Sequence, residues 1–172
     1  MTGIVVRSEE TRDGVAIREI TYAAFLNHPH HPAGAFPTEH KIVDGLRDAG
    51  ALTLSLVAED SGEIVGHVAF SPVLVNGEDM GWYGLGPVSV RPDRQRQGIG
   101  TALIKAGLRQ LEESGAAGVV LVGDPNYYER FGFRSRPELQ LEGVPSEYVL
   151  SLPIAGDVPS GSVTFHEAFG IR

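Results

Sequence analysis

The chain has 172 residues, of which 42% are hydrophobic and 21% are charged, as is typical of one soluble globular domain. A formal net charge of −8 argues against nucleic acid as a partner, because its phosphates favour a basic surface. The chain contains no Cys, which excludes disulfides, thiolate catalysis and zinc–cysteine sites. It shows no membrane-spanning run and no signal-peptide pattern, so we expect a single cytoplasmic domain over residues 1–172.

The N-terminal half predicts a strand, two helices and a three-stranded meander. Residues 4–7 have the pattern of a short strand, and residues 11–25 form a helical pattern with a broad apolar face. Thr38 has the character of a helix cap, with Glu39 in the first turn of a second helix that Gly50 ends. Strands follow at residues 52–59, 64–75 and 80–90.

The C-terminal half predicts a β-α-β unit and several short elements. Residues 102–114 have helical spacing, and residues 119–122 are fully apolar, as in a buried parallel strand. We therefore expect residues 88–90 and 119–122 to be parallel neighbours with a right-handed crossover. Pro87 lacks a backbone donor, which predicts a bulge or a break in pairing beside it. The remaining elements are a short helix at 126–131 and strands from 133, at 148–152 and at 162–165 that complete the sheet.

Residues 88–101, Val-Ser-Val-Arg-Pro-Asp-Arg-Gln-Arg-Gln-Gly-Ile-Gly-Thr, are the most informative stretch. A β-branched run is followed by an arginine-rich turn and by two glycines that open a helix. The first amides of a helix lack internal partners and carry partial positive charge, which predicts a phosphate or pyrophosphate site. Thr101 and Ala102 after Gly100 exclude a Walker A loop, and Leu103 excludes a dinucleotide fingerprint.

The pattern that does fit is Gln95-x-x-Gly98-x-Gly100, which resembles the acetyl-coenzyme A signature of the GNAT superfamily, the Gcn5-related N-acetyltransferases. A second segment, Tyr-Tyr-Glu-Arg-Phe-Gly-Phe at residues 127–133, is similar to an aromatic element found late in the same domain. The order and separation of the two elements also match the family, and the resemblance covers most of the chain.

The resemblance implies the GNAT fold, an α/β (α+β) architecture. A mixed central sheet of about six to seven strands, with a splayed parallel pair, would be flanked by about four helices. The implied activity is acetyl transfer from acetyl-CoA to a primary amine of a small molecule or peptide, without a metal. Family members often form homodimers, for which the C-terminal strands are candidates. The alternative is a non-catalytic module that binds acyl-CoA as a sensor or regulator.

The resemblance also assigns roles to individual residues. Tyr128 corresponds to the family tyrosine that donates a proton or a hydrogen bond to the thioester sulfur. Asn126 lies only two residues before it, which departs from the family spacing. The predicted cofactor-binding residues are Val88, Ser89, Val90, Arg94, Gln95, Arg96, Gln97, Gly98, Ile99, Gly100, Thr101 and Asn126.

The general base has several candidates. Glu39 is one, although an acidic residue in a first helical turn more often stabilises the helix dipole; Glu78, Asp79 and Ser89 are weaker, and an ordered water chain is the other option. His67, on a strand, reads as a buried and satisfied side chain. The cluster of His28, His30 and His31 favours a substrate-facing loop over a metal site. Trp82 and Tyr83 either wall the acceptor pocket or belong to the core.

Overall fold

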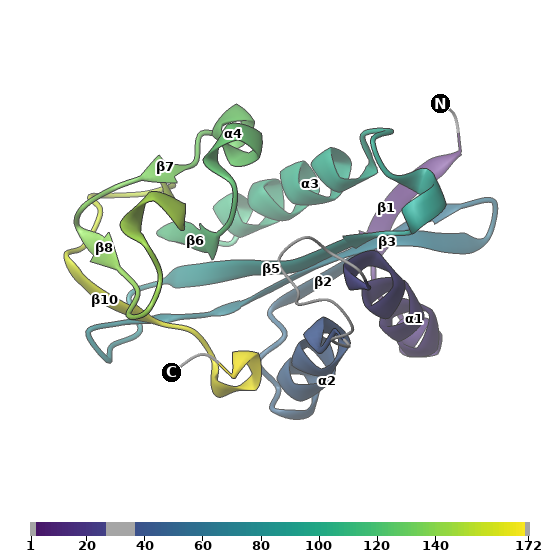
Figure 1. Cartoon of the computed structure of the whole chain (residues 1–172), viewed down its shortest axis with the longest axis horizontal. Coiled ribbons are helices and arrows are strands. Elements are labelled where there is room, and N and C mark those ends of the chain that lie inside the picture. The colour runs from purple at the N-terminus through teal and green to yellow at the C-terminus, as the bar shows by residue number, and fades with distance from the viewer. Residues whose placement is uncertain (1–2, 27–36, 171–172) are drawn as a thin grey trace. The chain divides into compact units, whose positions relative to one another are not determined.

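A computed structural model describes residues 3–26 and 37–170 of the chain (Figure 1). The chain divides into two compact units, one built from Met1–Phe70 with Gly86–Gly107 and the other from Ser71–Leu85 with Leu108–Arg172. Two strands and one helix contribute residues to both units: β3 (Glu63–Pro72), β5 (Trp82–Val90) and α3 (Ile99–Glu113).

The strands form a seven-stranded mixed sheet in the order β1-β2-β3-β5-β6-β9-β7 and a three-stranded sheet in the order β4-β10-β8. With the four α-helices of the described residues, this confirms the expected mixed α/β fold class. None of the described helices is both long and apolar enough to cross a membrane.

The first unit pairs its strands as an antiparallel meander. Its other elements are β1 (Ile4–Ser8), α1 (Gly14–Phe25), α2 (Glu39–Asp48) and β2 (Leu54–Asp60), with 3-10 turns at Thr11–Asp13 and Pro92–Arg94. Strand β1 pairs with β2 from Ile4↔Asp60 to Ser8↔Leu56, and β2 pairs with β3. Helices α1 and α2 lie on the face of this unit's strands opposite to the first half of α3, residues 99–107 (Figure 1), and there Ile17, Val43 and Val57 form a buried cluster.

The second unit contains a parallel pairing of β5 with β6, but residues 88–90, which were predicted to pair with 119–122, lie beyond Gly84, the last residue of β5 that pairs with β6. Residues Trp82, Tyr83 and Gly84 of β5 pair in parallel with Gly118, Val119 and Val120 of β6. Strand β6 also pairs antiparallel with β9, and its residues 119–121 are buried as expected, whereas Val122 is exposed. The elements of this unit are β4 (Leu74–Val75), β6 (Gly118–Val122), α4 (Pro125–Tyr128), β7 (Arg134–Ser135), β8 (Leu139–Gln140), β9 (Val149–Pro153) and β10 (Gly161–Thr164), with 3-10 turns at Glu129–Phe131, Ser146–Tyr148 and Glu167–Phe169.

Two strand predictions are wrong. The strand expected at residues 64–75 ends at Pro72, and Leu74–Val75 forms a separate strand, because Pro72 has no N–H to continue the ladder. The strand expected at residues 162–165 does not complete the central sheet. It is β10, which pairs antiparallel with β4 and parallel with β8 in the smaller sheet.

Candidate functional site

The turn between β5 and α3 holds five of the twelve predicted cofactor-binding residues, from Arg94 to Gly98. Gln95 fastens the turn to the end of β5, since its side-chain Nε2 donates to the Val90 carbonyl at 3.1 Å. Ile99, the first residue of α3, is buried at 3% exposure and anchors the start of the helix. Gln95 itself is exposed, as are the three residues between it and Ile99, which are Arg96, Gln97 and Gly98. The turn is therefore held at both ends and open to solvent between them.

The backbone of this turn requires a glycine at position 98. Gly98 has a φ of +86°, in the left-handed region that other residues rarely adopt, and Arg96 also has a positive φ of +64°. A Cβ built on Gly98 would meet nothing within 4 Å. The glycine thus permits the turn and leaves space beside the first amides of α3, where the helix dipole favours an anion.

The arginines of the turn differ in their partners. Arg94 forms an ion pair with Asp60 at 2.8 Å, and its Nε donates to Gln97 Oε1 at 3.2 Å. Arg91 is paired with Asp93 at 2.7 Å and with Glu63 at 3.3 Å. Arg96 is exposed. Arg94 therefore holds the turn against the end of β2, while Arg96 carries its charge at the surface.

The strand that leads into the turn alternates in burial. Val88 and Val90 are half-buried, whereas Ser89 between them is only 1% exposed. The Ser89 hydroxyl has no hydrogen-bond partner among the described residues. A buried hydroxyl without a partner is costly, so this one requires a physical explanation.

Tyr128 and Asn126 lie in the second unit, on the short helix α4. Asp124 caps this helix by accepting a hydrogen bond from the Asn126 backbone N–H at 2.9 Å, and Pro125 occupies the first helical position. The Asn126 residue is exposed. The backbone N–H groups of Tyr127 and Tyr128 both donate to the Asp124 carbonyl at 3.1 Å, which places both tyrosines in this helix.

The Tyr128 ring is packed on three sides. It makes edge-to-face contacts with Tyr127 and Phe133, at centroid distances of 4.9 and 6.0 Å. A Cβ on Gly123 would lie 2.7 Å from Tyr128 Cε2, so only glycine fits beneath the ring. Burial, with a smaller contribution from Tyr127, raises the pKa of Tyr128 to about 12. The phenol is thus a hydrogen-bond donor throughout the physiological pH range.

The other residues weighed from the sequence have structural contacts. The Glu39 carboxylate accepts the Thr38 backbone N–H at 3.2 Å, at the start of α2. Asp79 accepts the Gly81 backbone N–H at 3.0 Å, and Glu78 is exposed. Trp82, at 2% exposure, belongs to a buried core cluster of the second unit.

The cluster of His28, His30 and His31 lies outside the described residues. Within residues 3–26 and 37–170, no three His, Cys, Asp or Glu side chains are grouped as a metal site would require.

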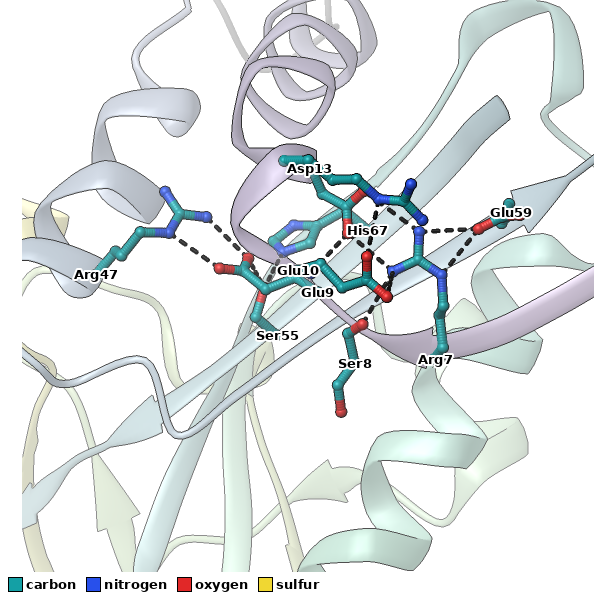
Figure 2. A network of polar contacts seen from close by, with 10 residues as sticks. Arg7, Ser8, Glu9, Glu10, Asp13, Arg47, Ser55, Glu59 and His67 are labelled. Carbon is teal, nitrogen blue, oxygen red and sulfur yellow. Dashed lines mark hydrogen bonds and ion pairs between the residues drawn. The ribbon is translucent and has the colours of Figure 1, made fainter. Parts of the chain in front are cut away.

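A polar network in the first unit was missed by the sequence reasoning (Figure 2). Arg7 bridges Asp13 and Glu59, each at 2.8 Å. Beside it, Arg47 binds Glu9, which in turn contacts Ser55. These partners lie up to 52 positions apart in the chain, so no local pattern could have revealed them.

His67 is the buried end of this network. Its Nε2 lies 2.7 Å from Ser55 Oγ, but its Nδ1 has no hydrogen-bond partner among the described residues. Burial lowers the pKa of His67 to about 4, with Glu9 opposing that shift and Arg47 adding to it. The side chain is therefore buried as expected, yet only half satisfied.

Comparisons with known proteins agree on one family. The model of the Acetyltransferase (GNAT) family matches residues 14–133. The chain is 50% identical over 96 residues to the uncharacterized N-acetyltransferase YhbS of Escherichia coli K12, a match that covers 55% of this chain and 58% of YhbS. It is 31% identical over 140 residues to the uncharacterized N-acetyltransferase YjhQ of the same strain, covering 79% of this chain and 71% of YjhQ.

Two solved structures resemble the whole chain. A GNAT family acetyltransferase from Brucella melitensis, crystallised with acetyl-CoA, is 47% identical with a TM-score of 0.85, covering 98% of this chain and 99% of its own. YhbS from Escherichia coli, crystallised with CoA, is 35% identical in its structural alignment with a TM-score of 0.87, covering 98% of this chain and 92% of its own.

Proposed function

Because this chain belongs to the GNAT acetyltransferase family, we propose that it transfers the acetyl group of acetyl-CoA to a primary amine of a small molecule or peptide. The observation that carries the proposal is the exposed turn before α3, with open space beside Gly98. A diphosphate fits such a turn, because helix N-terminal amides and a nearby guanidinium group both favour anions.

The cofactor contacts follow from this placement. The backbone amides of Gln97, Gly98, Ile99, Gly100 and Thr101 would bind the pyrophosphate, and the exposed Arg96 would add its charge. Arg94 and Gln95 would act mainly by holding the turn in shape, as their contacts with Asp60 and Val90 indicate.

The pantetheine arm would be bound by backbone rather than by side chains. Val88 and Val90 are half-buried residues at the end of β5, and their peptide groups are the candidates for pairing with the pantetheine amides. Ser89 lies between them with its side chain buried. In the second unit, the exposed Asn126 is the remaining candidate cofactor contact.

Tyr128 is proposed as the hydrogen-bond donor to the thioester sulfur. An ordinary alkyl thiol has a pKa of about 8.5, and the pKa of Tyr128 is raised to about 12. Moving the phenolic proton fully onto the thiolate would be uphill by about 5 kcal/mol on this difference. We therefore assign Tyr128 the stabilisation of the leaving thiolate by a hydrogen bond, with the phenol keeping its proton.

The activity is tested with purified protein, acetyl-CoA and a panel of amines. The panel contains spermidine, L-lysine, an aminoglycoside and a peptide with a free N-terminal alanine, and free thiol release is measured alongside the mass of each product. Acetylation of a panel member with stoichiometric thiol release supports the proposal. Tight CoA binding by calorimetry with no transfer to any amine would favour the acyl-CoA sensor instead.

A further inference from the structure

A hydrogen-bonded chain runs through the first unit from a partly exposed carboxylate to a buried imidazole (Figure 2). Ser55 Oγ donates to Glu9 Oε1 and lies 2.7 Å from His67 Nε2. Arg47 donates two hydrogen bonds to the same Glu9 carboxylate, at 2.8 and 3.0 Å. The Glu9 side chain is 20% exposed, whereas His67 is fully buried.

The protons available to the hydrogen bonds between Glu9, Ser55 and His67 determine the tautomer of His67. The Ser55 hydroxyl has one proton, and it is directed to Glu9. The hydrogen bond between Ser55 and His67 must then be donated by the imidazole Nε2–H. A neutral ring with its proton on Nε2 has an unprotonated Nδ1. Nδ1 is therefore a buried acceptor, and it has no partner among the described residues.

A second unsatisfied polar atom lies on the neighbouring strand. The Arg91 N–H donates to the Val65 carbonyl at 2.9 Å, and the Val73 N–H donates to the Trp82 carbonyl at 3.1 Å, so β3 and β5 run antiparallel. The two bonds differ by one residue in register, so the pairing of β3 with β5 is irregular between them; counted from the nearer bond, Val65–Arg91, Ser89 lies opposite His67. Directly opposed residues share a face of the sheet. The Ser89 hydroxyl, also buried without a described partner, thus faces the same side as His67.

Two such atoms on opposed residues can be satisfied together by one bridging water, because each needs a partner and their strands are about 5 Å apart. Ser89 stands between Val88 and Val90, to which the proposed function assigns the pantetheine arm. The chain Glu9–Ser55–His67 therefore leads from solvent to the strand that would carry the thioester.

We propose that His67 is a relay residue that removes the proton lost by the acceptor amine. Through a water bound by Ser89, the amine proton reaches Nδ1 while the Nε2 proton passes to Ser55 and the Ser55 proton passes to Glu9. Glu9 then releases one proton to solvent, so one proton enters the relay and one leaves it; His67 is left with its proton on Nδ1 and returns to the Nε2–H tautomer before the next turnover. The inference rests on the proposed acetyl transfer.

The electrostatic surroundings of Glu9 and His67 agree with a role in proton relay. Burial acts to raise the pKa of Glu9, but the hydrogen bonds from Arg47 and Ser55 outweigh it, and the pKa is lowered. A protonated Glu9 is therefore a stronger acid than an ordinary carboxylic acid, which favours release of its proton. The ring of His67 stays neutral throughout the relay, because one proton arrives as another departs.

The charged groups that act on His67 are few. Glu9, after β1, and Arg47, on α2, are the two whose charges shift its pKa. Asp44 on α2 pairs with Arg47 at 3.4 Å. Strands β2 and β5 contribute the hydroxyls of Ser55 and Ser89, and the buried residues of α1 are the uncharged Ile17, Ile20 and Thr21.

The same three side-chain types occur in hydrolases that use serine as a nucleophile, but the connectivity here differs. In a catalytic triad the carboxylate orients the histidine, and the histidine accepts the serine proton. Here the carboxylate accepts the serine proton directly, and the histidine is the donor to serine. Ser55 is thus arranged to pass protons and not to attack a carbonyl.

The relay is tested first by breaking its middle link. Ser55→Ala is expected to lower kcat about a hundredfold, at the low end of what proton-transfer groups contribute, and to leave the Kd for CoA within about twofold. Ser55→Thr, which keeps the hydroxyl, should restore most of the rate. Ser8→Ala, on the neighbouring strand β1 with an exposed side chain, is the matched control. The solvent deuterium isotope effect on kcat should fall in Ser55→Ala alone.

Nitrogen-15 NMR of the wild-type protein tests the tautomer without turnover. The expected spectrum shows neutral His67 with its proton on Nε2 at pH 7. An Nδ1–H tautomer, an imidazolium, or equal kcat and isotope effect in Ser55→Ala and Ser8→Ala would overturn the relay. Failure of the wild-type protein to bind CoA or to acetylate any amine would instead overturn the proposed function, because the NMR result does not depend on it.

Discussion

Arg94 and Asp60 form an ion pair that ties the glycine turn to the end of strand β2. The guanidinium Nη2 lies 2.8 Å from Asp60 Oδ2, and the two side chains are only 16% and 19% exposed. The two residues are 34 positions apart in the chain. The pair neutralises much of the Arg94 charge at the place where we propose that a diphosphate binds.

The first prediction follows from this pair. Arg94→Gln leaves the Asp60 carboxylate without its counter-charge beside the proposed anion site, so the Kd for CoA should rise by about tenfold, or about 1.4 kcal/mol. Adding Asp60→Asn removes that carboxylate and should recover a substantial part of the loss. Calorimetry on both single variants and the double variant measures the coupling. If Asp60→Asn changes nothing in the Arg94→Gln background, the two residues do not act as a pair in binding.

The second prediction concerns Gly98. Gly98→Ala introduces a Cβ where the protein has open space, and we expect the Kd for CoA to rise about tenfold or more because that space receives the ligand. The positive φ should also cost about 1 kcal/mol of folding stability.

A matched control exists just beyond the other end of the same helix. Gly115 has a φ of +88°, against +86° for Gly98, and a Cβ there would also meet nothing within 4 Å. Gly115→Ala should lose similar stability in denaturant unfolding and bind CoA normally. Equal CoA affinity in the two variants would contradict the placement of the ligand at Gly98.

Local sequence was sufficient for the glycine turn because the turn is a local structure. Gly98 permits the positive φ, and the helix that begins at Ile99 follows directly in the chain. The parallel direction of β5 and β6 was also predictable, since a helix between two strands favours it, but the paired residues, 82–84 and not 88–90, were not.

The missed features depend on contacts between distant residues. Ser55 meets His67 across 12 positions and Glu9 across 46, and neither spacing has a motif. The break of β3 at Pro72 had a local signal, the missing N–H, but the apolar residues beyond it continued the strand pattern. The partners of β10 could not be predicted, because short strands carry too few residues to specify a register.

The third prediction tests Tyr128 by removing only its hydroxyl. Tyr128→Phe keeps the packing against Gly123 and Phe133, so the melting temperature and the Kd for CoA should stay close to those of the wild-type protein. Loss of the hydrogen bond to the leaving sulfur should lower kcat by about ten- to a hundredfold, which corresponds to the roughly 1.5 to 3 kcal/mol of a bond to a charged group. Tyr148→Phe, which alters an exposed tyrosine of the same unit, is the control and should retain full kcat. An unchanged kcat in Tyr128→Phe would remove this residue from the reaction.

The last prediction uses the buried imidazole as a pH sensor of stability. Burial lowers the pKa of His67 from 6.5 to about 4 in the folded protein, so between these values the unfolded chain binds the extra proton. The free energy of unfolding must therefore fall as the pH is lowered through this window, and it is at its full value above pH 6.5. The difference between the two pKa values corresponds to at most about 3 kcal/mol.

His67→Gln, whose amide can still reach Ser55, cannot titrate, and its stability should decline less steeply between pH 6.5 and 4. Urea unfolding of both proteins at several pH values compares the slopes, which are independent of the constant cost of the substitution itself. Parallel slopes would mean that His67 titrates normally and is not enclosed as the structure indicates.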